Sequence, residues 1–145
     1  MEIYTIGFTK KSAAEFFRAL RKADIEQVLD VRLNNVSQLA GFTKRDDLDF
    51  FVRELCHAVY RHEPLLAPTQ LLLDSYKKKH RPWSEYEEGF LQLMADRRIK
   101  ERLHPNLFER HTVLLCSEPT AERCHRRLVV EYLDKTWGDV TGVHL

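Results

Sequence analysis

The chain has 145 residues, the size of one domain, and 23 Lys and Arg balance 22 Asp and Glu to give a net charge of +1. This balance excludes a global field that attracts nucleic acid or an anionic membrane, so any anion site must be local. The 43% hydrophobic and 31% charged residues exclude a disordered or fibrous protein.

Three cysteines, an odd number, argue against a disulfide framework, and the start of the chain does not read as a secretion signal. The longest apolar runs are far shorter than the about 20 residues that cross a bilayer. We therefore expect a cytoplasmic protein with reduced thiols and no membrane partner.

The first half of the chain alternates strand and helix patterns. Residues 3–7 form a short β-rich run that ends at Gly7, and Ser12 with Glu15 makes a capping-box pattern for a helix that ends near Ala23. The patterns that follow predict a strand at 26–32, an irregular loop at 33–42, a helix capped by Thr43, and a short strand at 60–63.

The second half predicts helices between 69 and 102, a buried strand at 111–116, a helix to about Lys135 and a last short strand at 140–145. Strands that alternate with helices imply parallel pairing with right-handed crossovers. We therefore predict a single α/β domain over residues 1–145, with a small, mostly parallel sheet flanked by helices in a Rossmann-like, three-layer arrangement. Ligands bind such sheets beyond the carboxyl ends of the strands, where segments 7–9, 30–32 and 116–118 lie.

The segment 116–127 is the most concentrated set of reactive side chains, and it joins a strand end to a helix start. A thiol there, near unpaired helix N–H groups and arginines, can have a lowered pKa and act as a nucleophile or redox group. Cys116 is that thiol. Alternatively, Cys116 is a small buried hydrophobe that ends a core strand.

Cys124 and His125 lie on or beside the apolar stripe of the following helix, so both side chains should point inward. Cys124 then packs in the core, and His125 either fixes the helix to the sheet or serves as acid or base beside a thiolate. Helical neighbours diverge by about 100°, and seven residues separate Cys116 from Cys124, unlike paired zinc ligands. No metal is predicted.

Two arginines are predicted anion ligands. Arg126 and Arg127 flank the apolar stripe on opposite sides, so at most one of them faces the strand ends, where it could hold a phosphate or carboxylate. Asp30 and Arg32 share one face of a strand end. They either pair with each other, or Asp30 orients His125 while Arg32 holds an anion.

Glycine and charge patterns are less specific. Gly7 permits close backbone approach, but no dinucleotide or P-loop motif is present, so no cofactor is predicted. The basic residues between 77 and 102 could contact a phosphate backbone, with Trp83 and Tyr86 stacking on bases. However, these aromatic residues also fit helical core spacing, and acidic residues interrupt the positive field, which is typical of a solvated face.

Short motifs along the whole chain resemble the prokaryotic family catalogued as domain of unknown function 488. In chain order they are Tyr4-Thr5-Ile6-Gly7, Asp30-Val31-Arg32-Leu33-Asn34-Asn35, Ser37-Gln38-Leu39-Ala40-Gly41-Phe42, Leu66-Ala67-Pro68-Thr69, Trp83-x-x-Tyr86, Leu114-Leu115-Cys116-Ser117-Glu118 and Cys124-His125-Arg126-Arg127. The resemblance covers residues 3 to 144 and implies a small intracellular α/β domain without a settled substrate. Cys116, Glu118, Cys124, His125 and Arg126 match the family's signature.

This chain departs from the family pattern after the first strand. Many members carry histidine directly after the first-strand glycine, where this chain has Phe8. The departure weakens models that place metal or catalysis at the first loop. It favours His125 as the functional histidine, or a non-catalytic role for the protein.

Our leading hypothesis is a polar pocket at the strand ends that binds a small anionic or nucleotide-like molecule, with thiol-dependent catalysis in one version. The expected catalytic residues are Cys116, His125, Asp30 and Glu118, and the expected ligand-binding residues are Arg32, Arg126, Gly7, Thr9, Ser117 and Cys124. The alternatives are a non-enzymatic nucleic-acid or protein binding module that uses the basic region 77–102, and a purely structural Cys-His-Arg set that locks the last helix to the sheet.

Overall fold

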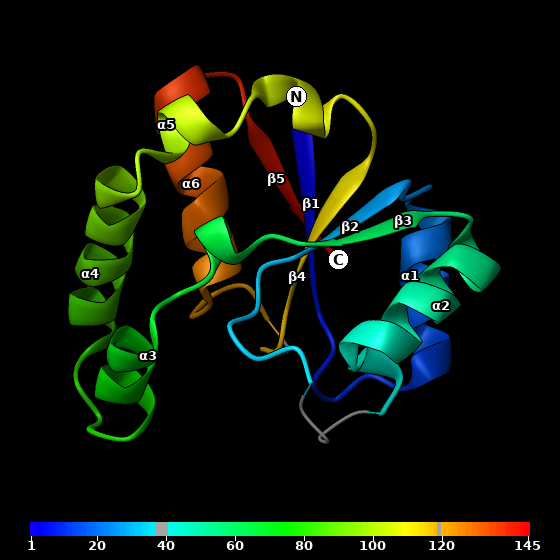
Figure 1. Ribbon diagram of the computed structural model, residues 1–145, viewed down its shortest axis with the longest axis horizontal. Helices are drawn as coiled ribbons and strands as arrows, with labels where there is room; N and C mark the ends of the chain where they lie inside the picture. The colour runs from blue at the N-terminus through cyan, green and yellow to red at the C-terminus, as the bar shows by residue number, and fades with distance from the viewer. Residues whose placement is uncertain (37–40, 119) are drawn as a thin grey trace.

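The computed structural model describes residues 1–36, 41–118 and 120–145, and one parallel sheet lies between two layers of helices (Figure 1). The strands are β1 (Glu2–Gly7), β2 (Gln27–Asp30), β3 (Val59–His62), β4 (Thr112–Cys116) and β5 (Thr141–His144). They pair in the order β3-β2-β4-β1-β5, and each pairing is parallel. The predicted three-layer α/β domain is confirmed.

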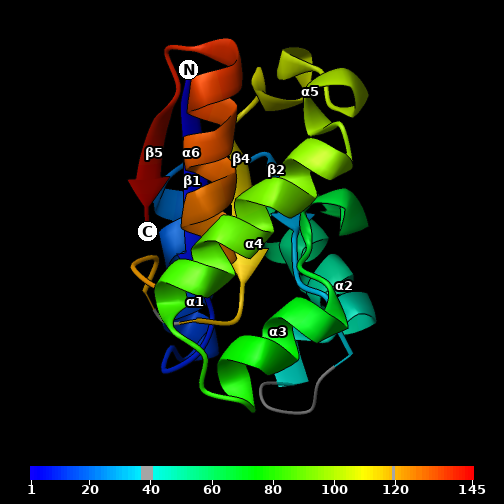
Figure 2. The ribbon, with the colours of Figure 1, turned by 90° about the vertical axis from the view of Figure 1, so that its left-hand side faces the viewer.

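The helices divide between the two faces of the sheet. On one face lie α1 (Ala13–Lys22) and α2 (Arg45–Cys56); on the other lie α4 (Trp83–Asp96), α5 (Ile99–Arg102) and α6 (His125–Trp137), with α3 (Gln70–Lys77) packed against α4 (Figures 1 and 2). Three short 3-10 helices connect them, at Gly41–Thr43, Pro64–Leu66 and Pro105–Phe108. None of the helices in the described part of the chain is long and apolar enough to span a membrane.

Local capping signals set the starts of α1 and α3. Ser12 and Glu15 form the predicted capping box of α1, and Thr69 caps α3 by accepting from the backbone N–H of Leu72. The prediction that Thr43 caps α2 is wrong, because Thr43 ends a 3-10 turn and Lys44 is the N-cap. The Thr43 carbonyl instead accepts a hydrogen bond from Arg32.

The start of α6 also differs from the prediction. The pattern predicts a helix directly after the turn that follows β4, but α6 begins only at His125. Cys124 is its N-cap, with φ −139° and ψ 142°, and this backbone is extended. The side chains of Cys124 and His125 therefore do not follow helical spacing, and both can turn toward the end of β4.

The pleat of the strands separates two hydrophobic cores. Leu29 and Leu114 belong to the core under α4 and α6, whereas Val28 and Val113 belong to the core under α1 and α2. Successive side chains of a strand point to opposite faces. Cys116 therefore lies on the face of α4 and α6, as Leu114 does.

Candidate functional site

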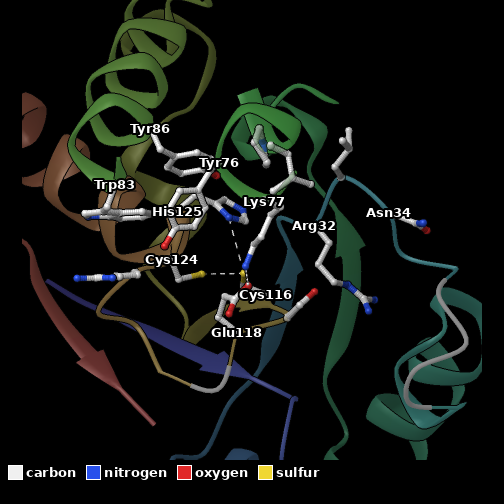
Figure 3. Close-up of a pocket in the computed structure, with 15 residues that line it drawn as sticks. Arg32, Asn34, Tyr76, Lys77, Trp83, Tyr86, Cys116, Glu118, Cys124 and His125 are labelled. Atoms are coloured by element: carbon white, nitrogen blue, oxygen red, sulfur yellow. Dashed lines mark hydrogen bonds and ion pairs between the residues drawn. The ribbon is translucent and has the colours of Figure 1, made fainter. Parts of the chain in front are cut away.

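A cavity of about 260 Å³ opens where the carboxyl ends of β2 and β4 meet α3, α4 and the start of α6 (Figure 3). Cys116, Cys124 and His125 line its inner part, and Tyr76, Trp83 and Tyr86 form an aromatic wall. Its other lining residues are Arg32, Leu33, Asn34, Pro68, Leu73, Lys77, Ser117, Glu118 and Arg123. The structure thus brings the predicted Cys-His segment to a cavity at the strand ends.

The thiol of Cys116 is at the centre of this inner part. Cys116 is the last residue of β4 and is only 4% exposed. Its Sγ lies 2.8 Å from Sγ of Cys124 and 3.7 Å from Nδ1 of His125 (Figure 3). Three groups that can exchange protons therefore meet at the end of the central strand.

The orientation of His125 is fixed by the backbone of β2's carboxyl end. Nε2 of His125 lies 2.7 Å from the carbonyl oxygen of Val31. A carbonyl oxygen can only accept a hydrogen bond, so Nε2 carries the proton and donates it. Nδ1 is therefore the nitrogen that faces Cys116, either as an acceptor from the thiol or, when protonated, as a donor to the thiolate.

The electrostatics of the three groups favour a thiolate at Cys116. Burial opposes its ionisation, but the hydrogen bond from Cys124 and the charge of His125 outweigh burial and hold the pKa of Cys116 well below its usual range. Burial also lowers the pKa of His125, yet the attraction of the Cys116 sulfur and the hydrogen bond to it raise that pKa overall. Burial and the contact with Cys116 raise the pKa of Cys124, which stays protonated.

Arg126 places a buried positive charge behind this group. It is 1% exposed and donates to the carbonyl oxygen of Glu118 at 2.7 Å and to Oγ1 of Thr5 at 3.3 Å. Its Nη1 also lies 3.9 Å from Sγ of Cys124. Among the described residues, no carboxylate forms an ion pair with Arg126, and Arg126 does not line the cavity. Arg126, which was predicted to bind an anion, therefore places its charge near the thiol pair from outside the cavity.

Gly7 and Thr9 hold the loop after β4 in place. A Cβ built at Gly7 would lie 1.5 Å from the carbonyl oxygen of Glu118 and 2.5 Å from Nη1 of Arg126, so only glycine leaves room for this loop. The backbone N–H of Thr9 donates to the carbonyl oxygen of Ser117 at 3.1 Å. Gly7 and Thr9 are thus placed as supports of the loop, while Ser117 itself lines the cavity.

Asp30 and Arg32 form a buried pair away from the thiols. Nε and Nη2 of Arg32 each lie 2.9 Å from a carboxylate oxygen of Asp30, and the hydroxyl of Tyr60 donates to the same carboxylate. The predicted alternative in which the two residues pair with each other is observed. Asp30 shares the face of Val28, opposite Cys116, so it does not orient His125; the Val31 carbonyl does.

Glu118 is joined to α3 rather than to the thiols. Its carboxylate forms an ion pair with Nζ of Lys77 at 2.5 Å, and both side chains are partly exposed beside the cavity (Figure 3). Arg123, which is exposed, also lines the cavity. Arg123 is therefore the basic group placed to meet an anion, because Lys77 is paired with Glu118. The Arg32 guanidinium is held by Asp30 and points away from Cys116 (Figure 3).

The aromatic wall was not predicted from the sequence. Helical spacing assigned Trp83 and Tyr86 to the core, and nothing marked Tyr76. In the structure Trp83 and Tyr86 stack with ring centroids 5.0 Å apart, and Tyr76 lies 5.4 Å from each. Burial and the nearby Cys116 and Cys124 sulfurs raise the pKa of Tyr86. The Trp83-x-x-Tyr86 motif in the family resemblance was the signal for this wall.

Within the described part of the chain, the donor atoms grouped closely enough to hold a metal are those of Cys116, Cys124 and His125, which all lie within 4.8 Å of one another. The predicted divergence of the adjacent Cys124 and His125 side chains is wrong, because Cys124 is extended and not helical. Two sulfurs on one tetrahedral zinc ion, at Zn–S of about 2.3 Å, are about 3.8 Å apart. The observed separation of 2.8 Å is shorter than this ligand spacing and longer than the about 2.05 Å of a disulfide bond, so the two sulfurs are in close contact without a bond.

The basic region 77–102 is largely engaged within the protein. Lys77, Lys78, Arg81 and Arg98 form ion pairs with acidic neighbours, and Arg97 donates to the backbone carbonyls of the 64–67 segment. Nothing in this arrangement favours nucleic-acid binding over a solvated face.

Comparison with known proteins adds one match. A family model described as domain of unknown function DUF488 matches residues 12–133. The matched range contains all three residues of the thiol and imidazole group. The motif at residues 37–40 lies outside the described residues, as does Pro119. Neither the curated proteins nor the solved structures that were searched gave a match.

Proposed function

Because the chain belongs to the family of domain of unknown function 488, whose name carries no reaction, we propose its function from the site itself: thiol-dependent chemistry on a small molecule in the cavity. Cys116 is the nucleophile and His125 the acid or base. The observation that carries the proposal is the imidazole held by the Val31 carbonyl, with its other nitrogen 3.7 Å from the Cys116 sulfur. This arrangement, a base oriented by a third group beside a nucleophile, is typical of activated thiols.

The cavity lining supports a ligand with two parts. The wall of Tyr76, Trp83 and Tyr86 suits a flat or apolar portion, and Arg123 suits an anionic group. The small anionic ligand expected from the sequence is kept, and Arg123 is the residue that binds its charge. A cytoplasmic location, where thiols remain reduced, is part of the proposal.

The test uses two alkylating reagents that differ only in charge, neutral iodoacetamide and anionic iodoacetate. Modification of each cysteine is followed by peptide mass spectrometry against pH. Cys116 should react with a pH midpoint below the about 8.5 of an ordinary thiol. Cys56, whose pKa is raised by burial, serves as the internal comparison. A midpoint at or above 8.5 for Cys116, or no reaction, would overturn the proposal.

The charge of the ligand is tested with the same reagents. Replacing Arg123 by Met should slow iodoacetate modification of Cys116 while leaving the iodoacetamide rate unchanged, because only the anionic reagent is attracted. The effect should weaken as salt is added. An equal effect on both reagents would contradict an anion-binding role for Arg123.

A further inference from the structure

Two cysteines of the cavity are arranged so that their sulfur atoms can react with each other. Cys116 ends the central strand β4, and Cys124 is the extended residue before α6. The extended backbone turns the Cys124 side chain toward the strand end, where Sγ approaches Sγ of Cys116 to 2.8 Å. Both residues line the cavity, so a molecule bound there meets the pair together.

We propose that this pair carries out thiol–disulfide exchange on a small disulfide that bears an aromatic or anionic group, with Cys124 as the resolving thiol. This inference rests on the proposed function and names its substrate class. The wall of Tyr76, Trp83 and Tyr86 and the cation of Arg123 fit such a substrate. The geometry requires no movement of an element to bring the second thiol to the first.

The reaction balances as two exchange steps. The Cys116 thiolate attacks one sulfur of the substrate, a bond forms between Cys116 and that sulfur, the substrate's S–S bond breaks, and the released thiolate takes a proton from His125. Cys124 then transfers its proton to the neutral imidazole and attacks Sγ of Cys116. The second substrate thiolate leaves, and the Cys116–Cys124 disulfide remains. An external dithiol reduces this disulfide and is itself oxidised.

Arg126 assists the second step. Cys124 must become an anion before it attacks, and burial together with the Cys116 contact opposes that change. Nη1 of Arg126 lies 3.9 Å from the Cys124 sulfur, and no carboxylate among the described residues neutralises the guanidinium. Its charge is therefore available to stabilise the Cys124 thiolate.

The experiment uses 5,5′-dithiobis(2-nitrobenzoate), an aromatic, anionic disulfide whose released thiolate is coloured. A Cys56→Ser background removes the half-buried third thiol at the end of α2, outside the cavity. The reduced protein should release two thiolates per chain and end without an adduct, with its mass lowered by two hydrogens. Adding Cys124→Ser should halve the release and leave a stable mixed disulfide on Cys116. Adding Cys116→Ser should abolish rapid release.

The outcomes separate this inference from the proposed function. The Cys56→Ser protein could end with an aryl adduct on each of the two cavity cysteines, or with one adduct on Cys116. Either result would show that Cys124 does not attack the mixed disulfide on Cys116, and the inference would be overturned. Iodoacetamide modification of Cys116 at low pH would still support the proposed function, because alkylation needs no second thiol. Loss of both reactions would overturn both proposals.

Discussion

The sulfur atoms of Cys116 and Cys124 lie 2.8 Å apart, although one residue ends the strand β4 and the other precedes the helix α6. The contact joins two residues that are eight positions apart in the sequence. It brings the two thiols within reach of each other, a closeness that the sequence pattern left open.

Oxidation of this pair should stabilise the fold. A link across a short loop removes conformations from the unfolded chain, and the loop-entropy relation gives about 2–3 kcal/mol for a loop of this length. Urea unfolding of the oxidised and reduced protein, compared at one pH, measures the difference. Cys124→Ser should show no difference between the two conditions. Equal unfolding midpoints for the oxidised and reduced forms of the unsubstituted chain would show that strain in the disulfide cancels its stabilising effect.

Replacing His125 by Gln should raise the pKa of Cys116. The imidazolium stabilises the thiolate, so its loss favours the neutral thiol and moves the alkylation profile to higher pH. Each unit of that shift moves the midpoint of the alkylation profile up by one pH unit, and below the midpoint it lowers the thiolate fraction about tenfold; iodoacetamide rates across pH report it. His62→Gln is the matched control, because His62 also contacts a backbone carbonyl but does not line the cavity. An unmoved profile in the His125 variant would argue against the thiolate–imidazolium pair.

Replacing Arg126 by Met should slow the second exchange step. Burial and the contact with Cys116 raise the pKa of Cys124, and the charge of Arg126 opposes that rise. Without it, the mixed disulfide on Cys116 should persist about three- to fourfold longer for each unit by which that pKa rises, because the smaller thiolate fraction is partly offset by greater nucleophilicity. This is seen as a slower second phase of colour release. Arg127→Met is the control, because Arg127 pairs with Glu131 and Glu87. The second phase of colour release should be slower in the Arg126 variant than in the Arg127 variant, and equal rates would contradict the role of Arg126.

Replacing Gly7 by Ala should destabilise the protein. The new Cβ would overlap the backbone oxygen of Glu118, and overpacking of this kind costs about 1–3 kcal/mol or more. The free energy of unfolding in urea measures the loss. Gly41→Ala should be nearly neutral, since a Cβ there meets nothing within 4 Å. Similar losses at both positions would show that the clash at Gly7 is not the cause.

Replacing Asp30 by Asn should lower stability without moving the pH profile of Cys116. Breaking a buried pair by removing one partner costs about 3–5 kcal/mol, because the Arg32 guanidinium is left uncompensated. Tyr60→Phe removes one hydrogen bond to the same carboxylate and should cost less, about 1–2 kcal/mol. Urea unfolding measures the change in stability, and iodoacetamide rates across pH measure the Cys116 profile. A shifted Cys116 profile in the Asp30 variant would instead place Asp30 among the residues that tune the thiol.

Much of the fold was predictable from local patterns. Strand and helix periodicity, with the Ser12 capping box, gave the element order and the three layers. The start of α6 was not predictable from periodicity, because the residues before His125 carry side chains that also fit a helical stripe. The loop between β4 and α6 also packs against residues 7 and 9, a contact that is distant in sequence and that no local pattern specifies.

The site was predictable only in part. Cys116 and His125 come together as the position of their segment at a strand end suggested. Asp30 could not be assigned correctly because the strand pattern does not say which face of the sheet a side chain joins until the helices are placed. Tyr76 lies on α3, and its approach to Cys116 depends on how α3 packs against α4, which no local pattern specifies.

The acceptor that orients His125 is a main-chain carbonyl, that of Val31. Every amino acid supplies the same oxygen, so substitutions at position 31 leave the acceptor in place and comparison of family sequences cannot reveal its role. Variation that disturbs this contact must instead shift the end of β2 relative to α6. Selection for His125 orientation would therefore act on the packing between the sheet and α6 and not on the identity of residue 31.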